Sequence, residues 1–373
     1  MTSPLKVPVN EPVLTKEAKQ YVAEAMESGW ISSAGKYIEQ FEAEFAAFLG
    51  VKHAVTTTSG TTAIHLALAT LNIGPGDEVI VPDFTMMGSI LPVLYCGATP
   101  IFVDAKPETF NIDPSLIEKK ITKKTKAIMP VHLYGQSADM DPILAIAKKH
   151  NLYVVEDAAE AHGATYKGCL CGSMGDIGCF SFYANKIITT GEGGMLVTND
   201  DQLVARARTL KDLAHSPQKR FWHEEMGFNY RMTNLQAAVG LGQLKHIDEF
   251  IKHKQWMADR YREGLKGIKG LRLPAVKKDS LNVYWMYGVL VEESFPMAKD
   301  ELRAALREKG VDTRDFFYSS ASQPLFKDLP SAKESFPVSK MLSERGFYLP
   351  SGLALTEEQV DYVCSALREI ASI

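Results

Sequence analysis

The first 50 residues of the chain show apolar residues at helical spacing. The first set is Ala18, Tyr21, Val22, Ala25 and Met26, and the second is Ile38, Phe41, Phe45, Phe48 and Leu49. This spacing predicts two amphipathic helices, the first capped by Thr15 and the second ended by Gly50. We expect both apolar faces to pack into the core.

Short apolar runs then alternate with helical stretches. HAVTTTS, DEVIVP, TPIFVD, KAIMPVHLY and LYVVED read as strands. Helices are predicted over TTAIHLALATL, after residue 83, over residues 114 to 121 and over residues 141 to 150. The alternation predicts an α/β fold, with helices on both faces of a mostly parallel sheet. Several strands are apolar throughout, which burial on both faces requires.

After residue 160 the pattern changes. Glycines at hairpin spacing predict short strands and turns, GGMLVTND predicts another strand, and helical character dominates from residue 200 to about 266. The remaining residues mix strand and helix patterns. We therefore expect a large domain over residues 1–245 and a smaller α+β domain over residues 246–373.

Bulk properties exclude several classes of protein. The 373 residues are 46% hydrophobic, and 41 basic against 45 acidic side chains give a net charge of −4. This balance carries no signal for a nucleic-acid or membrane partner. No apolar run is long enough to span a bilayer, and MTSPLKVPVNEP lacks the apolar core of a signal peptide. The five cysteines have neither disulfide nor zinc spacing, so we expect no metal and a reducing cytoplasm.

Candidate chemistry gathers where strands end, which is where open α/β sheets bind ligands. Ser59-Gly60-Thr61-Thr62 joins a strand to a helix, so its N–H groups favour an anion such as phosphate, although many ordinary turns look alike. Asp157 ends LYVVED, as either a helix cap or a functional acid, and Ser181 ends CFSF.

Lys186 follows in SFYANKIITTGEGGM, between apolar residues. Most lysines are solvated surface charges, but an amine held in such surroundings can lose its proton and form a Schiff base. Phosphate donors, a carboxylate and a buried lysine are what a pyridoxal phosphate (PLP) enzyme needs, because the carboxylate keeps the cofactor nitrogen protonated. His162 is more typical of a packed histidine than of a catalyst.

Three segments in this order carry a resemblance to a known family: EDAAEAHGA, GDIGCFSFYANKIITTGEGGMLVTND and GFNYRMTNLQAAVGLGQL. GWISSAGKYIEQFE and KAIMPVHLYGQSADMDPI extend it over almost the whole chain. The sequence resembles the sugar aminotransferases of the DegT/DnrJ/EryC1/StrS family. The resemblance implies an aspartate aminotransferase-like fold (PLP fold type I).

The resemblance also implies roles for individual residues. Lys186 matches the Schiff-base lysine, Asp157 the partner of the pyridinium nitrogen, and Glu160 a residue near the cofactor ring and its 3-hydroxyl. The phosphate binders are matched by Gly60, Thr61 and Ser181. Asn229 matches an asparagine that reaches the phosphate across a subunit interface, which implies a homodimer with shared active sites. Trp30 and Ser32, in GWISS, are expected to bind substrate.

The sequence departs from the family at two places. Met86 stands in VPDFTMMGS where relatives have an aromatic residue that stacks on the cofactor, and Phe84 need not face the ring. In RDFFYSSASQPLF, Asp315, Ser319 and Ala321 replace the two prolines and the histidine of a loop usually written R-P-x-F-Y-P-x-H. Arg314, Phe317 and Tyr318 of that loop are retained and are expected to contact substrate.

The resemblance implies a reaction in two halves. L-glutamate gives its amino group to PLP, leaving pyridoxamine phosphate, which aminates C4 of a nucleotide-linked 4-keto-6-deoxy sugar. GDP-4-keto-6-deoxy-D-mannose, giving GDP-perosamine for an O-antigen, is the favoured acceptor. The alternatives are a dTDP- or UDP-4-keto-6-deoxyglucose aminotransferase, a PLP-dependent sugar dehydratase and a noncatalytic PLP-binding regulator. Some relatives that perform dehydration carry histidine at the position of Lys186, so the lysine favours amino transfer.

Overall fold

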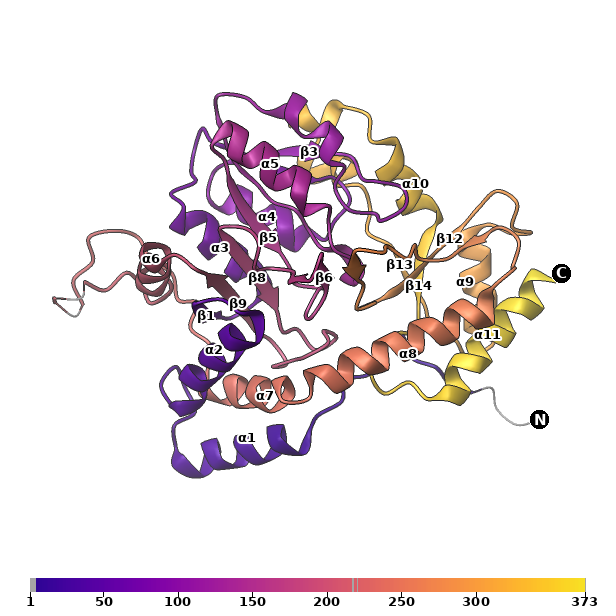
Figure 1. Ribbon diagram of the computed structural model, residues 1–373, viewed down its shortest axis with the longest axis horizontal. Helices are drawn as coiled ribbons and strands as arrows, with labels where there is room; N and C mark the ends of the chain where they lie inside the picture. The colour runs from indigo at the N-terminus through magenta and orange to yellow at the C-terminus, as the bar shows by residue number, and fades with distance from the viewer. Residues whose placement is uncertain (1–4, 217, 220, 373) are drawn as a thin grey trace.

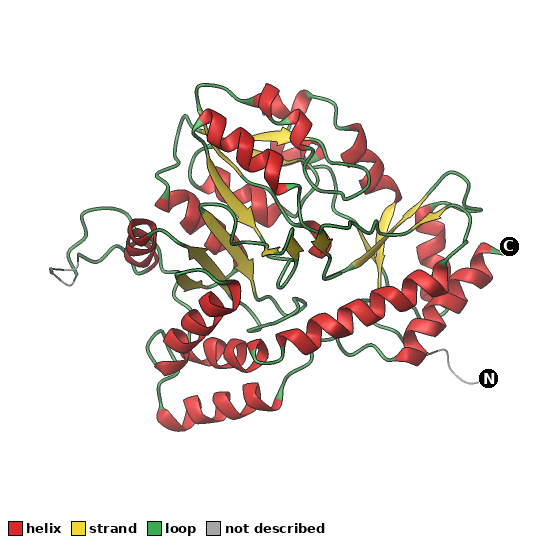
Figure 2. Cartoon of the chain, viewed as in Figure 1, coloured by secondary structure: helices red, strands yellow, loops and turns green. Residues whose placement is uncertain are grey.

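A seven-stranded sheet forms the centre of the computed structural model, which describes residues 5–216, 218–219 and 221–372 (Figures 1 and 2). Its strand order is β1-β9-β8-β5-β4-β2-β3. The strands are β1 His53–Thr57, β2 Glu78–Pro82, β3 Thr99–Val103, β4 Thr125–Ile128, β5 Tyr153–Asp157, β8 Ile177–Ser181 and β9 Gly194–Thr198. β9 runs antiparallel to both neighbours and the other pairs are parallel, so the prediction of a mostly parallel sheet is confirmed.

Helices cover both faces of this sheet, as Figure 1 shows. Neighbouring residues of one strand point to opposite faces; in β5, Val155 packs under α3 and Val154 packs on the side of α5. The helices of this part are α1 Lys16–Ser28, α2 Lys36–Leu49, α3 Gly60–Thr70, α4 Met87–Tyr95, α5 Met140–His150, α6 Asp201–Lys211 and α7 Asn234–Leu244. Thr15 accepts a hydrogen bond from the Ala18 N–H and Gly50 ends α2 in the left-handed region, as predicted.

One of the predicted helical stretches was wrong. Residues 114 to 121 form two 3-10 turns, Pro114–Leu116 and Glu118–Lys120, instead of a helix. Within these turns and their caps, burial is confined to Pro114 and Ile117, which is too little apolar surface to hold a helix against the sheet. The helical run after residue 200 breaks between α6 and α7, where Leu213 and Ala214 have positive φ, and this segment protrudes from the body (Figure 1).

A second sheet of order β10-β12-β14-β13 lies beside the first (Figure 1). Its strands are β10 Leu271–Arg272, β12 Tyr287–Val291, β13 Arg314–Asp315 and β14 Gly346–Leu349, all antiparallel. Its helices are α8 Ile247–Leu265, α9 Lys299–Glu308, α10 Pro337–Arg345 and α11 Glu357–Ala371. The boundary predicted at residue 245 falls between α7 and α8 and stays a prediction.

A small third sheet joins the two halves of the chain. β6 Thr165–Tyr166 pairs with β7 Cys169–Leu170 and with β11 Ser280–Leu281. Four further 3-10 turns are Leu133–Gly135, Ser320–Ser322, Pro324–Phe326 and Pro330–Lys333. Among the residues described here, no helix combines the length and apolar character needed to cross a bilayer.

Candidate active site

A pocket of about 470 Å³ opens beside the carboxyl ends of β5 and β8, within the usual size range for small-molecule sites. It brings together nine of the residues singled out by sequence: Gly60, Thr61, Met86, Asp157, Glu160, Ser181, Lys186, Arg314 and Phe317. Residues that the sequence analysis did not single out line it as well, among them Thr85, Ser89, Tyr183, Asn185, Glu192, Trp285 and Tyr348.

Lys186 lies on the connection between β8 and β9. Its N–H donates to the Tyr183 carbonyl at 2.9 Å, and the Thr190 N–H donates to the Phe182 carbonyl at 2.9 Å, which closes the connection into a compact loop. The neighbouring Asn185 carbonyl accepts hydrogen bonds from Asn10 Nδ2 at 3.2 Å and from Trp285 Nε1 at 2.7 Å. Segments far apart in sequence therefore fix the place of the lysine.

The Lys186 amine faces one carboxylate and one aromatic ring. Its Nζ lies 3.9 Å from Glu160 Oε1 and 3.9 Å from the centroid of the Trp285 ring. Burial lowers the pKa of Lys186, against the opposing effect of the Glu160 and Asp157 carboxylates. A lowered pKa makes the neutral, nucleophilic amine easier to reach.

Glu160 is the nearest titratable neighbour of that amine. Burial raises the pKa of its carboxyl to about 7, although Lys186 and the Tyr134 N–H, which donates to Oε2 at 2.7 Å, both favour the ionised form. A group that titrates near neutral pH can accept or return a proton at little cost.

Asp157 is held at the end of β5 by two donors. Ser89 Oγ donates to Oδ2 at 2.6 Å, and the Ala159 N–H donates to Oδ1 at 3.0 Å. Thr85 and Ser89 share a further hydrogen bond of 3.0 Å, so the first turn of α4 supports the carboxylate. Asp157 is 4% exposed, which places an oriented acid at the floor of the pocket.

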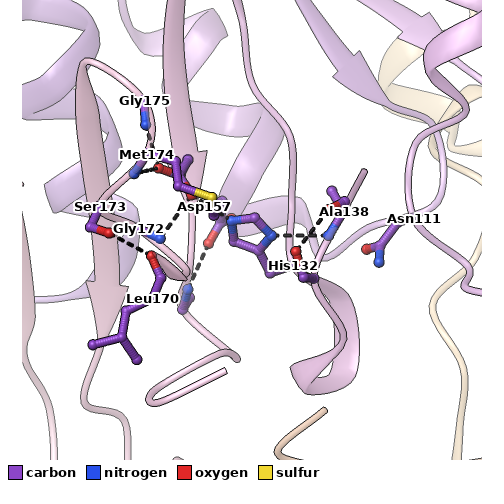
Figure 3. A network of polar contacts seen from close by, with 12 residues as sticks. Asn111, His132, Ala138, Asp157, Leu170, Gly172, Ser173, Met174 and Gly175 are labelled. Atoms are coloured by element: carbon purple, nitrogen blue, oxygen red, sulfur yellow. Dashed lines mark hydrogen bonds and ion pairs between the residues drawn. The ribbon is translucent and has the colours of Figure 1, made fainter. Parts of the chain in front are cut away.

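A buried polar network lies behind Asp157 (Figure 3). Glu156 accepts three backbone N–H groups, from Gly172 at 2.8 Å and from Met174 and Gly175 at 2.6 Å each. His132 Nδ1 accepts the Ala138 N–H at 3.1 Å, so Nε2 carries the proton that it donates to Glu156 at 2.8 Å. The network fixes the turn before β8 and, through the Asp157 carbonyl, the loop that begins at His132.

The first turn of α3 faces the opposite end of the pocket. Ser59 caps the helix through a reciprocal pair with Thr62, which leaves the Gly60 and Thr61 N–H groups without intrahelical partners. A Cβ added to Gly60 would lie 2.7 Å from Ser181 Cβ, so only glycine allows β8 and α3 to approach this closely. The turn offers N–H and hydroxyl donors to an anion.

Comparison with known proteins agrees with this geometry. The DegT/DnrJ/EryC1/StrS aminotransferase family matches residues 12–368. The chain belongs to this family. It is similar to the GDP-perosamine synthases of Caulobacter vibrioides, at 46% identity over 98% of both chains, and of Escherichia coli, at 45% over 98% of this chain and 99% of the relative. The PLP form of a putative sugar aminotransferase from Streptococcus pneumoniae superposes with a TM-score of 0.93, at 27% identity over 99% of both chains.

PLP, the cofactor of this family, fits the residues present in the aminotransferase. Asp157 would pair with the ring nitrogen, Lys186 would reach the reactive carbon, and the close contact between Gly60 and Ser181 leaves the donors of α3 open to the phosphate. These assignments of individual residues stay proposals.

Four predicted site residues do not line this pocket of the single chain. Tyr318 points outward with 58% of its surface exposed, and Trp30 is 61% exposed. The carbonyls of Trp30 and Ser32 both accept hydrogen bonds from Asn234, at 2.6 Å each. Asn229 accepts from Arg231 Nε at 3.0 Å and lies five positions before Asn234 in the chain.

The structure shows what the residues that depart from the family pattern contact. Met86 lines the pocket at the start of α4, whereas Phe84 packs in the core against Phe316 and Phe317. Asp315 pairs with Lys299 and Arg303, and Ser319 Oγ donates to the buried Asp83 at 2.6 Å. Charged and hydroxyl side chains therefore hold the loop at the two positions where the family resemblance implies proline.

The sequence analysis missed Trp285 and Ser89 of the aminotransferase. Trp285 lies in NVYWMYGVLV, an apolar run that reads as an ordinary strand, so its sequence gives no signal of a site. Ser89 could have been found, because it lies one helical turn after Thr85, close to the carboxyl end of β2.

Proposed function

We propose that this aminotransferase moves an amino group from L-glutamate to C4 of GDP-4-keto-6-deoxy-D-mannose, giving GDP-perosamine. The observation that carries the choice of acceptor is the similarity, over nearly the full length of both chains, to two proteins named GDP-perosamine synthase. The product would serve an O-antigen or related surface polysaccharide, and we place the reaction in the cytoplasm.

When bound, PLP supplies an electron sink that stabilises negative charge on the carbon losing its proton. Asp157, oriented by Ser89, holds the cofactor nitrogen protonated. Lys186 holds and moves the proton between carbon atoms, as general base in one half-reaction and general acid in the other. Glu160, beside the amine, balances its charge.

The wall opposite Lys186 is suited to the nucleotide sugar. Arg314, Phe317 and Tyr348 line the pocket together. A guanidinium and two aromatic rings are therefore available to the part of the pocket that bound PLP would not fill. We assign the diphosphate to Arg314, because guanidinium groups bind phosphate oxygens in pairs. Tyr318, at the outer edge, would contact the exposed part of the substrate.

We further propose a homodimer in which each pocket is completed by the neighbouring subunit. Large apolar side chains are exposed shortly before Asn229 in the chain, at Trp222 and Met226, and in the segment that Asn234 contacts, at Trp30 and Ile31. Such a surface is typical of a protein interface. Asn229 would then reach the partner's cofactor phosphate, and Trp30 and Ser32 the partner's sugar nucleotide.

The test converts the PLP-loaded protein to its pyridoxamine form with glutamate and removes the excess donor. GDP-, dTDP- and UDP-linked 4-keto-6-deoxy sugars are then added separately, and the return of the PLP absorbance is followed. We expect return with the GDP sugar alone and a product mass that shows amination. If the PLP absorbance returned with the dTDP or UDP sugar instead, that sugar would be the acceptor. If it returned with none of the three, the assignment of a nucleotide-sugar acceptor would be overturned.

Lys186→Ala tests the chemistry independently of the acceptor. We expect no turnover and no conversion of the cofactor to its pyridoxamine form on adding glutamate, with the fold intact by circular dichroism. Near-normal activity would overturn the mechanism, and a dehydrated product from the unaltered chain would identify a dehydratase. A noncatalytic regulator would bind PLP but show no conversion by glutamate.

A further inference from the structure

Trp285 makes two contacts with the loop that carries Lys186. Its ring face lies 3.9 Å below the Lys186 amine, measured to the ring centroid, and its indole N–H donates to the Asn185 carbonyl at 2.7 Å. The side chain is buried, with 5% of its surface exposed. One residue of the C-terminal part therefore both anchors the loop and faces its reactive atom.

A second buried lysine, Lys254, lies directly behind this tryptophan. It projects from α8, is 2% exposed, and its Nζ donates to the Trp285 carbonyl at 2.9 Å and to the Ser351 carbonyl. Among the described residues it makes no ion pair, and burial lowers its pKa to about 7. Burying an amine without a carboxylate is costly, so the two carbonyl contacts must offset that cost.

We propose that Trp285 seats the Lys186 side chain by placing its ring face under the amine, and that Lys254 is a positioning residue that acts through Trp285 by fixing its backbone carbonyl. The proposal rests on the proposed function, because only a catalytic lysine that is repeatedly released from its cofactor needs a seat. It adds a function for two residues that the reaction described above leaves unused.

Cation–π attraction gives the seat a measurable effect. The ring face favours the ammonium form, so it raises the proton affinity of Lys186. The other groups that face this amine are Glu160 and Asp157, which also favour the ammonium, and His162, which burial keeps neutral. Replacing Trp285 leaves those three groups in place and removes the ring face together with the indole hydrogen bond to the Asn185 carbonyl, whereas Trp285→Phe removes that hydrogen bond but keeps an aromatic face.

The experiment measures the proton affinity of Lys186 in the cofactor-free protein. The chain is acetylated competitively across a range of pH, and the modified Lys186 peptide is quantified by mass spectrometry. We expect Trp285→Leu to lower the apparent pKa of Lys186 by about one unit, which corresponds to a cation–π energy of about 1.4 kcal/mol. Trp285→Phe should lower it less, because a weaker aromatic face remains.

Lys254→Met should shift the same pKa downward, since the ring loses its backbone support. Matched controls are Trp256→Leu and Lys252→Met, which remove the same residue types at two other positions, both on α8, and should leave the pKa of Lys186 unchanged. An unchanged pKa in folded Trp285→Leu and Trp285→Phe would overturn the seat, and Lys254→Met behaving like Lys252→Met would overturn the role of Lys254. The assay contains neither cofactor nor sugar, so its outcome is independent of which acceptor the enzyme uses.

Discussion

His162 lies five residues beyond Asp157 and packs against Phe180 and Phe182, with ring centroids 5.4 and 5.6 Å away. Burial lowers the pKa of its imidazole to about 3. The native protein therefore holds this ring neutral near neutral pH. We assign the ring to packing behind the pocket, as the sequence analysis favoured.

His162→Leu should make the protein more resistant to acid. The unfolded chain binds a proton at His162 below about pH 6.5 while the native chain does not until about pH 3, so stability is lost as pH falls through this window. At pH 5 protonation of the unfolded chain at His162 lowers the free energy of unfolding by about 2 kcal/mol, and the leucine variant does not lose this stability. Urea unfolding of the cofactor-free protein at pH 5 and 7.5 measures it.

The control for this prediction is His150→Leu, at the partly exposed C-terminal end of α5. It should change stability little at both pH values. An equal difference between His162→Leu and the unaltered protein at pH 5 and at pH 7.5 would contradict the prediction.

Single residues of the site were predictable to different degrees. Asp157 and Ser181 end apolar strands, so the fold class alone places them at the ligand-binding edge. The place of Lys186 depends on a loop closed by Asn10 and Trp285, contacts that no local pattern encodes. Its surroundings were inferred from its apolar neighbours, and the contact with Trp285 was not.

At the scale of an element, the start of α3 depends on the absence of a side chain at Gly60. Gly60→Ala should weaken PLP binding at least about tenfold, or about 1.4 kcal/mol, because the new methyl group pushes α3 away from Ser181. Fluorescence titration of the cofactor-free protein with PLP measures the change.

Gly74→Ala is the matched control, since a Cβ there meets its nearest atom, the Cys96 carbonyl oxygen, at 3.9 Å. PLP affinity should be unaffected in that variant. Unchanged affinity in Gly60→Ala would show that α3 does not bind the phosphate.

The loop after β13 is held in place by hydrogen bonds to Asp83. Asp83 is fully buried, and its carboxyl accepts the Ser319 hydroxyl at 2.6 Å and the Ala321 N–H at 2.7 Å. Burial raises the pKa of Asp83, which these two donors oppose. Ser319 and Ala321, two of the residues that depart from the family pattern, therefore tie the Arg314 and Phe317 wall to the end of β2.

Ser319→Ala should raise KM for the nucleotide sugar about three- to tenfold, because losing one hydrogen bond to a buried carboxylate costs about 1–2 kcal/mol and loosens the wall. The half-reaction with glutamate should keep its rate, and Ser319→Thr should restore KM. Steady-state kinetics with each substrate varied separates these effects. An equal loss in both half-reactions would indicate general disruption instead.

Elements were predictable where the apolar pattern is long. The spacing in α1 and α2 fixed both helices and their caps, whereas the turns at 114 to 121 carried too few apolar positions to distinguish a helix from a 3-10 turn. The break between α6 and α7 was not located, because the sequence analysis predicted only that helical character dominates from residue 200 to about 266.

At the scale of the whole molecule, the proposed shared site predicts complementation. Lys186→Ala and Asn229→Ala chains, each inactive alone, should recover about a quarter of the unaltered activity after mixing and subunit exchange, because half the dimers are mixed and each has one intact site. Activity is measured alongside native mass spectrometry of the mixture. Mixed dimers without activity would show that each chain builds its own site.

Long-range connectivity was the least predictable feature of the molecule. The family resemblance supplied the fold, but the pairing of β11 with β6 and the contact of Asn10 with the lysine loop depend on packing between distant segments. Such contacts leave no periodic trace in the sequence.

The two anchors of the Lys186 loop also set an order of events during synthesis on the ribosome. β1, at the edge of the sheet, cannot pair until β9 has been made. The loop after β8 lacks its contact with Trp285 until about a hundred further residues have been made. Nascent chains that stop short of Trp285 have the strands of the sheet but lack the support of the lysine. We therefore expect cofactor capture to be a late step of biogenesis, which follows synthesis of the C-terminal part.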